Sequence, residues 1–193
     1  MSYLRLEKDA DGIVELIFDQ EGKSVNVMGD EYAEAMPQAL DELEAMKDEI
    51  AGIYVRSGKP GQIFAGGDIN MMLEMELDPS DEEREAMFRG ILASKEPLAR
   101  LERLGVPVAV GINGAALGGG FEIALSCHRR FALDDRSVKI GLPEAMLGLM
   151  PGAGGVVRMV RLLGMQEALT LISQGRQLDA RRALEKGLVH ELA

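Results

Sequence analysis

The chain has 193 residues, and 21 Lys and Arg against 32 Asp and Glu give it a formal net charge of −11. This length fits one domain, and a composition that is 47% hydrophobic and 27% charged is that of a folded globular protein, which excludes a disordered chain. The excess of negative charge argues against nucleic acid or anionic lipid as a partner, since both need clustered Lys and Arg.

Cysteine and histidine are too scarce for two further kinds of site. Cys127 has no second cysteine for an internal disulfide, and with His128 and His190 it makes too few ligands for zinc, so we expect no metal. The N-terminal segment contains acidic residues and lacks the apolar block of a signal peptide. No uncharged apolar run approaches the length of a membrane span, and we therefore expect a cytoplasmic protein.

Runs rich in branched and aromatic residues predict β-strands in the first two thirds of the chain. They occur at 3–6, 13–18, 52–57 and 106–112, with weaker runs at 130–133 and 138–141. Between them, the helical spacing of apolar residues predicts a first helix over 30–49. We expect Asp30 to cap this helix and Pro37 either to open its regular part or to kink it.

Further helices are predicted along the rest of the sequence. Ser80 and Glu83 have the spacing of a capping box and predict a helix that runs towards Leu104. Shorter helical stretches follow at 121–127, at 156–163 with 166–173, and at 180–186, and Gly164, Gly175 and Gly187 stand where they would end helices. Strands that alternate with helices predict the α/β class. No linker or repeat divides the sequence, so residues 1–193 are expected to form one domain.

Three common nucleotide-binding or catalytic motifs are absent. The nearest match to G-x-G-x-x-G is Gly152-Ala153-Gly154, which has Val157 in place of the third glycine. Neither G-x-x-x-x-G-K-[ST] nor G-x-S-x-G occurs. The sequence therefore argues against Rossmann dinucleotide binding, P-loop NTP cleavage and serine hydrolysis.

Three glycine-rich segments remain, at 64–70, 113–125 and 141–155. In the second, a strand-like run enters the glycines at 118–120 and a helix-like run leaves them. This order leaves backbone N–H groups free at a helix N-terminus, where they favour an anion or a developing oxyanion. The alternative is a tight turn in which glycine supplies a positive φ.

Two glutamates stand at the start of apolar stretches. Glu122 lies between Phe121 and Ile123, and Glu144 follows Pro143. Burying an unpaired carboxylate is costly, so this placement suggests a function, although Glu122 could instead point to water at a helix N-terminus. Two carboxylates in one partly dry site have their pKa values pushed apart, which leaves one base and one acid.

The glycine-rich segments resemble the crotonase superfamily, and within it the enoyl-CoA hydratase/isomerase modules of multifunctional fatty-acid oxidation enzymes of the 3-hydroxyacyl-CoA dehydrogenase type. The resemblance rests on SGKPGQIFAGGDIN, GINGAALGGGFEIAL and IGLPEAMLGLMPGAGGVVRMVRLLG, in this order, and extends from about Val14 to Val189. It implies a ββα spiral, usually trimeric, that binds acyl-CoA thioesters. It implies no cofactor, because coenzyme A is part of the substrate.

The resemblance also implies roles for particular residues. The thioester oxygen would bind the backbone N–H groups of Ala65 and Gly119, and Glu122 and Glu144 would be the catalytic carboxylates. The same motifs imply substrate-binding positions at Gly66, Asp68, Ile69, Gly118 and Met71. Alternatively, Asp68 caps the helix that follows it, and Met71 belongs to the core.

The implied reaction is the hydration of a 2-enoyl-CoA to a 3-hydroxyacyl-CoA in fatty-acid β-oxidation, for which the two glutamates would hold and activate a water. Alternatives on the same fold are an enoyl-CoA isomerase, a thioester hydrolase and a decarboxylase. A further alternative is an inactive fragment of a larger enzyme that only binds acyl-CoA.

The sequence departs from the resembled family in two places. Family members continue with further C-terminal helices, so residues 1–193 are expected to lack those helices, either as a truncated chain or as an N-terminal piece of a larger multifunctional enzyme. Gln62 stands where many relatives have a basic residue that helps to hold CoA, and Lys59 is the nearest substitute. Arg158 and Arg161 could face the CoA phosphates or cover the solvent side.

Overall fold

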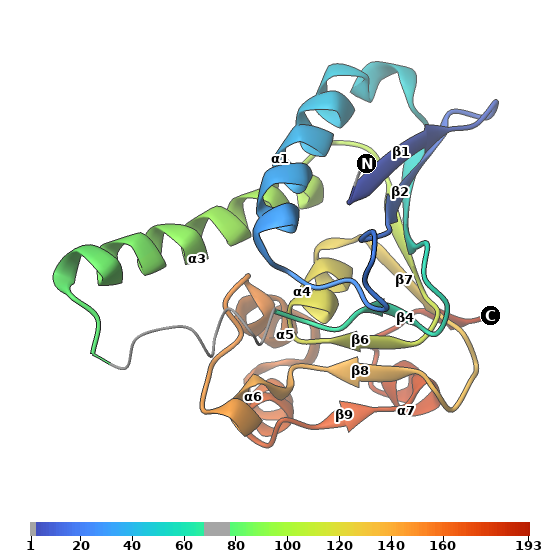
Figure 1. Ribbon diagram of the computed structural model, residues 1–193. Helices are drawn as coiled ribbons and strands as arrows, with labels where there is room; N and C mark the ends of the chain where they lie inside the picture. Colours follow the sequence, from blue (N-terminus) through green and yellow to red (C-terminus); the bar gives the residue numbers. More distant parts are fainter. Residues whose placement is uncertain (1–2, 68–77) are drawn as a thin grey trace.

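A computed structural model describes residues 3–67 and 78–193, and its strands form two sheets (Figure 1). The larger sheet has the order β1-β2-β3-β5-β7-β10. Its strands are β1 (Leu4–Lys8), β2 (Ile13–Phe18), β3 (Gly52–Ser57), β5 (Val108–Ile112), β7 (Arg129–Ala132) and β10 (Glu191–Leu192). β1 is antiparallel to β2, and the other neighbouring pairs are parallel.

The smaller sheet has the order β4-β6-β8-β9. Its strands are β4 (Gln62–Phe64), β6 (Ala115–Leu117), β8 (Lys139–Gly141) and β9 (Gln177–Leu178). β4, β6 and β8 are mutually parallel, whereas β9 is antiparallel to β8. Because neighbouring parallel strands end at the same edge of a sheet, the segments that follow β4, β6 and β8 meet at one edge.

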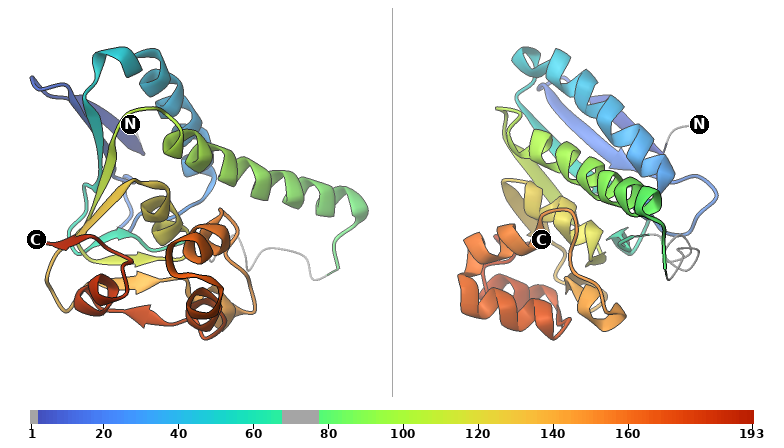
Figure 2. Two further views of the ribbon diagram at one scale, coloured as in Figure 1. Left: turned by 180° about the vertical axis from the view of Figure 1, so that it is seen from behind. Right: turned by 90° about the vertical axis from the view of Figure 1, so that its left-hand side faces the viewer.

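The helices divide between the two sheets (Figure 2). α1 (Asp30–Ala45), α3 (Asp81–Glu102) and α4 (Gly119–Ser126) lie on one side of the larger sheet. α5 (Gly155–Leu163), α6 (Met165–Ser173) and α7 (Ala180–Glu185) gather around the smaller sheet. Two short 3₁₀ segments, η1 (Lys47–Glu49) and η2 (Pro143–Leu147), complete the order.

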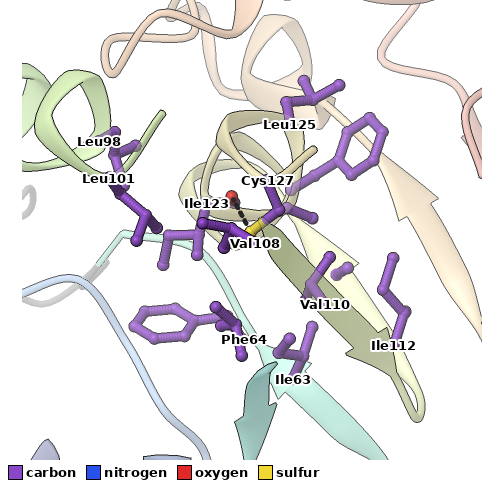
Figure 3. Close-up of a cluster of buried hydrophobic side chains, with 14 of the residues drawn as sticks. Ile63, Phe64, Leu98, Leu101, Val108, Val110, Ile112, Ile123, Leu125 and Cys127 are labelled. Atoms are coloured by element: carbon purple, nitrogen blue, oxygen red, sulfur yellow. Dashed lines mark hydrogen bonds between the residues drawn. The ribbon is translucent and has the colours of Figure 1, made fainter. Parts of the chain in front are cut away.

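The core extends from the larger sheet and its helices to the smaller sheet, and Figure 3 shows part of it. The side chains labelled there come from β4, α3, β5 and α4: Ile63, Phe64, Leu98, Leu101, Val108, Val110, Ile112, Ile123, Leu125 and the adjoining Cys127. All eight residues of α4 are buried, so packing from every side holds this short helix. By contrast, α3 is buried only near its C-terminal end, and residues 81–93 extend away from the body (Figure 1).

The predicted α/β class is confirmed, and so is the capping box at the start of α3. There the Ser80 hydroxyl accepts from the N–H of Glu83 at 3.3 Å. The prediction that Asp30 caps α1 is wrong, because Gly29 precedes the helix without a side-chain cap and Asp30 is its first helical residue. α1 continues through Pro37. Within residues 3–67 and 78–193, no helix is both long and apolar enough to cross a membrane.

Candidate active site

The three glycine-rich segments converge because each follows one of the parallel strands β4, β6 and β8. Gly66 and Gly118 approach each other closely, since a Cβ atom on Gly118 would lie 3.7 Å from the Cα of Gly66. The same Cβ would lie 3.1 Å from Oε1 of Glu144, which η2 carries. Gly118 has a φ of 54°, so the tight-turn interpretation of this glycine is correct and does not exclude a site.

The start of α4 supplies unpaired N–H groups next to this meeting point. Gly118 donates to the carbonyl of Gly141 at 3.0 Å, and Phe121 and Glu122 both donate to the carbonyl of Gly118. The N–H of Gly119, in the first turn of α4, has no acceptor among the described residues. It is therefore available to a ligand, as the sequence analysis expected.

The prediction for Ala65 does not hold, because its N–H is already occupied. It donates to the carbonyl of Asn26 at 2.9 Å, and Met28 donates to the carbonyl of Gly66 at 2.8 Å. In a trans peptide the C=O and N–H point in opposite directions, so the N–H of Gly67 points away from Met28. That N–H has no acceptor in the described part of the chain. Gly67 thus replaces Ala65 as the candidate donor from this segment.

Glu122 is the most deeply buried carboxylate of the site, with 2% of its surface exposed. Its Oε1 accepts from the N–H groups of Ala153 and Gly155 at 2.8 and 2.7 Å. Burial raises the pKa of Glu122, while these N–H groups and the charges of Arg158 and Lys95 oppose the rise. Its Oε2 has no hydrogen-bond partner among the described residues. The alternative of a glutamate that points to water is wrong.

Glu144 is half-buried, and its Oε2 is enclosed without a hydrogen-bond partner in the described structure. Burial raises the pKa of Glu144 to about 7, and the charge of Glu122 adds to the rise. A carboxyl group with this pKa can both donate and accept a proton near neutral pH. The two glutamates and the free N–H groups at Gly67 and Gly119 therefore form a set suited to proton transfer beside a carbonyl oxygen.

Other predicted residues have different outcomes. Asp68, Ile69 and Met71 lie outside the described residues. Gln62 is buried and donates to the carbonyl of Ser24 at 2.7 Å, and the Lys59 ammonium pairs with Asp19 at 3.0 Å. Neither side chain is thus free to hold a phosphate.

Two other features of the described residues lie apart from this site. A surface hollow of about 890 Å³ lies between residues 134–136 with Lys139 and residues 179–185, and neither Glu122 nor Glu144 lines it. No group of three or more His, Cys, Asp or Glu that could hold a metal occurs within residues 3–67 and 78–193.

Comparison with known proteins gives a consistent result. Residues 9–193 match the protein family described as Enoyl-CoA hydratase/isomerase. The chain is 41% identical to the fatty acid oxidation complex subunit alpha of Idiomarina loihiensis and 36% identical to that of Shewanella frigidimarina. Each alignment covers 97% of this chain and 25% of the relative, so the chain spans about a quarter of these curated relatives.

Solved structures share the fold of this chain. An enoyl-CoA hydratase from Geobacillus kaustophilus is 31% identical with a TM-score of 0.88, and the match covers 100% of this chain and 68% of that one. An enoyl-CoA hydratase from Bacillus anthracis is 26% identical with a TM-score of 0.87, and the match covers 100% of this chain and 70% of that one.

Proposed function

The chain belongs to the enoyl-CoA hydratase/isomerase family and has the crotonase fold, and from this premise we propose that it hydrates a 2-enoyl-CoA to a 3-hydroxyacyl-CoA. One observation carries the proposal: Glu144 lies against Gly118 at the start of the helix that carries the buried Glu122. A hydratase needs one group to take a proton from water and another to deliver one to carbon, and two carboxyl groups meet that need.

The backbone N–H groups of Gly67 and Gly119 would bind the thioester oxygen of the substrate. Negative charge develops on this oxygen as water adds to C3, and the loss of one such donor elsewhere costs about 3 kcal/mol of transition-state stabilisation. The two N–H groups are held in place before the reaction, because Met28 pairs with the segment at Gly66 and Gly67, and the N–H of Gly118 binds the carbonyl of Gly141. Coenzyme A enters as part of the substrate, and the proposal includes no separate cofactor.

The environments of the two glutamates suggest which is base and which is acid. Burial raises the pKa of Glu122, but two N–H donors and the charge of Arg158 favour its ionised form, so we assign it as the base that takes a proton from the attacking water. The raised pKa of Glu144 favours its protonated form, so we assign it as the acid that protonates C2. The water oxygen bonds to C3, and the electron pair of the C2=C3 bond passes through the enolate to the new C2–H bond.

The test is the loss of the conjugated enoyl-thioester absorbance of a short 2-enoyl-CoA. We expect Glu144→Gln to lower kcat by about 10²-fold or more, because the amide cannot deliver the proton. Glu42→Gln is the matched control, since Glu42 is exposed on α1 and pairs with no described residue. A chain that binds the thioester without hydrating it would contradict the proposal and favour the inactive acyl-CoA-binding fragment.

Isomerisation of a 3-enoyl-CoA is a second candidate that the same site supports. One carboxyl group with a pKa of about 7 could remove and return the proton by itself. Under this alternative, Glu122→Gln would keep the isomerase activity and lose only the hydratase activity. Formation of 2-enoyl-CoA from 3-enoyl-CoA by that variant separates the two functions.

A further inference from the structure

The turn before α5 orients Glu122, yet its own side chains do little to hold it. Ala153 and Gly155 donate both hydrogen bonds that Glu122 accepts. Gly152 and Gly154 contribute no side chain, and Gly154 has a positive φ of 101°. Because glycines allow a turn many conformations, an outside contact is needed to fix the direction of the two N–H groups.

Arg158 makes that contact from the first turns of α5. Its Nη1 donates to the carbonyl of Ala153 at 3.0 Å, on the residue whose N–H binds Glu122. Its Nε and Nη2 both donate to Oε2 of Glu102, at 3.2 and 2.9 Å. The Arg158 side chain is only 10% exposed. Both edges of the Arg158 guanidinium group are thus occupied. The side chain does not cover the solvent side of the helix, and it is not free to bind a CoA phosphate.

The partner of Arg158 is itself anchored. Glu102 is the last residue of α3, and its carbonyl lies 3.2 Å from Nε2 of His128. Nδ1 of His128 accepts from the N–H of Val108, so Nε2 carries the proton and donates to Glu102. The end of α3 is thereby fixed to β5 and to the start of β7. The chain of contacts runs from these elements through Glu102 and Arg158 to the turn.

Charge acts together with this geometry, and four elements present groups to Glu122. The charges of Arg158 on α5 and Lys95 on α3 lower the pKa of Glu122. On η2, the negative charge of Glu144 couples unfavourably with that of Glu122. The Tyr32 hydroxyl on α1 is buried and stays uncharged because burial raises the pKa of Tyr32. Arg158 is the one cation among them that also contacts the turn.

We propose that Arg158, held by Glu102, is a positioning residue that fixes the turn at Ala153 and so aims the free Oε2 of Glu122. This role requires the planar guanidinium group of arginine, because one cation must bind the Glu102 carboxylate on one edge and the Ala153 carbonyl on another. The assignment deepens the proposed hydration reaction and rests on it for its kinetic effect. Its effect on the ionisation of Glu122 does not depend on that reaction.

The kinetic test compares Arg158→Met with Arg100→Met. Arg100, which lies on α3 as Glu102 does, forms ion pairs with Glu44 and Asp41 that do not contact the turn, so its loss controls for the loss of an ion pair. We expect Arg158→Met to lower kcat by about 10-fold or more while KM changes little. The Glu122 carboxylate would no longer be oriented correctly, whereas the substrate contacts would remain. Arg158→Lys should fall between wild type and Arg158→Met, and it also serves if the Met variant does not fold.

The pH profile gives a readout that loss of structure alone would not move. The Arg158 charge holds the pKa of Glu122 down, and a base must be ionised to act, so Arg158→Met should move the acidic limb of kcat to higher pH. Arg158→Lys keeps the charge and should leave that limb near its wild-type position. An acidic limb and kcat equal to those of Arg100→Met would overturn the proposal.

A measurement without turnover separates this proposal from the hydratase assignment. In protein labelled with carboxyl-¹³C glutamate, the Glu122 signal is assigned by its absence in Glu122→Gln and titrated in wild type, Arg158→Met and Glu102→Gln. We expect the midpoint to rise in Arg158→Met and, by less, in Glu102→Gln. If the Glu122 midpoint is unchanged in both Arg158→Met and Glu102→Gln, the positioning role is overturned, even if the enzyme is active. If the midpoint rises but the wild-type chain is inactive, the positioning role is supported and only the proposed hydration reaction is refuted.

Discussion

Glu144 is held where its uncharged form is favoured, and this has a measurable consequence for stability. Its pKa is raised from 4.5 to about 7. Because the folded pKa lies above the unfolded one, the contribution of this group to stability is complete below about pH 4.5 and is lost as pH rises through about 7. At and above neutral pH, the site therefore opposes folding, as is common where function needs an unfavourable environment.

Glu144→Gln should accordingly be more stable than the wild type at pH 8. We expect a gain on the order of 1 kcal/mol, since solvent screening reduces the effect for a half-buried group. The gain should disappear at pH 4, where the glutamate is also neutral. Urea unfolding at both pH values measures it, with Glu42→Gln as control. Equal stability of Glu144→Gln and wild type at pH 8 would contradict the raised pKa.

A substitution at Gly118 tests how closely Glu144 packs against the start of α4. A Cβ there would lie 3.1 Å from Oε1 of Glu144, and φ is 54°. Gly187 has a similar φ of 75° but no atom within 4 Å of such a Cβ, which makes it a matched control. Gly187→Ala should lose about 1 kcal/mol of stability from its positive φ, and Gly118→Ala at least as much, because its ψ of −127° lies outside the left-handed helical region. Only Gly118→Ala should also lose hydratase activity, by about 10-fold or more, because Glu144 must move. Equal activity of the two variants would show that Glu144 is not confined by Gly118.

The sequence pattern predicts the two glutamates and Gly119 as site residues, and it indicates Ala65 where the structure favours Gly67. In an extended segment, alternate N–H groups point to opposite sides, so the side that pairs with a neighbour decides which N–H is free. Here the carbonyl of Asn26 pairs with the N–H of Ala65. That contact joins residues far apart in the chain, so the pattern around residue 65 contains no signal for it. Arg158 was noticed in the sequence, but its partner Glu102 could be identified only from the packing of α3 against α5.

At the scale of elements, the helices and the longer strands were predictable, whereas four of the shortest strands were not. β4 and β6 have three residues each, and the Ala-Ala-Leu of β6 has little strand preference of its own. They form because they pair with each other and with β8. β9 and β10, of two residues each, were missed for the same reason. Of the smaller sheet, which brings the site together, propensity thus revealed β8 but not β4, β6 or β9.

α3 begins with a capping box but packs against the core only near its C-terminal end, which predicts that its two halves differ in stability. Residues 81–93 are exposed, whereas Pro97, Leu98 and Leu101 are buried. The N-terminal half therefore depends on its capping box, and Ser80→Ala should remove about 1 kcal/mol of local stability. We expect faster amide hydrogen exchange over 81–93, with 98–102 and the global unfolding midpoint unchanged. A lowered global midpoint would mean that the whole helix unfolds as part of the core.

On the scale of the whole molecule, apolar side chains are exposed on two neighbouring elements. Met146 and Leu147 of η2 and Met165 and Leu169 of α6 are each at least 49% exposed, and these elements are in contact. Large exposed apolar patches are uncommon on monomeric proteins and mark interaction surfaces. This surface is compatible with the trimer that the family resemblance implies, which stays a prediction.

Light scattering on the purified chain tests the trimer. We expect a mass three times the 20.9 kDa of one chain. The double variant Met146→Glu and Met165→Glu should shift the mass towards the monomer, because burying two carboxylates in a contact between copies is unfavourable. Asp134→Glu, at a surface ion pair with Arg181, is a control that leaves the apolar patch intact. A wild-type chain that is monomeric at concentrations where it hydrates 2-enoyl-CoA would contradict the trimer. It would also show that the two glutamates need no neighbouring copy.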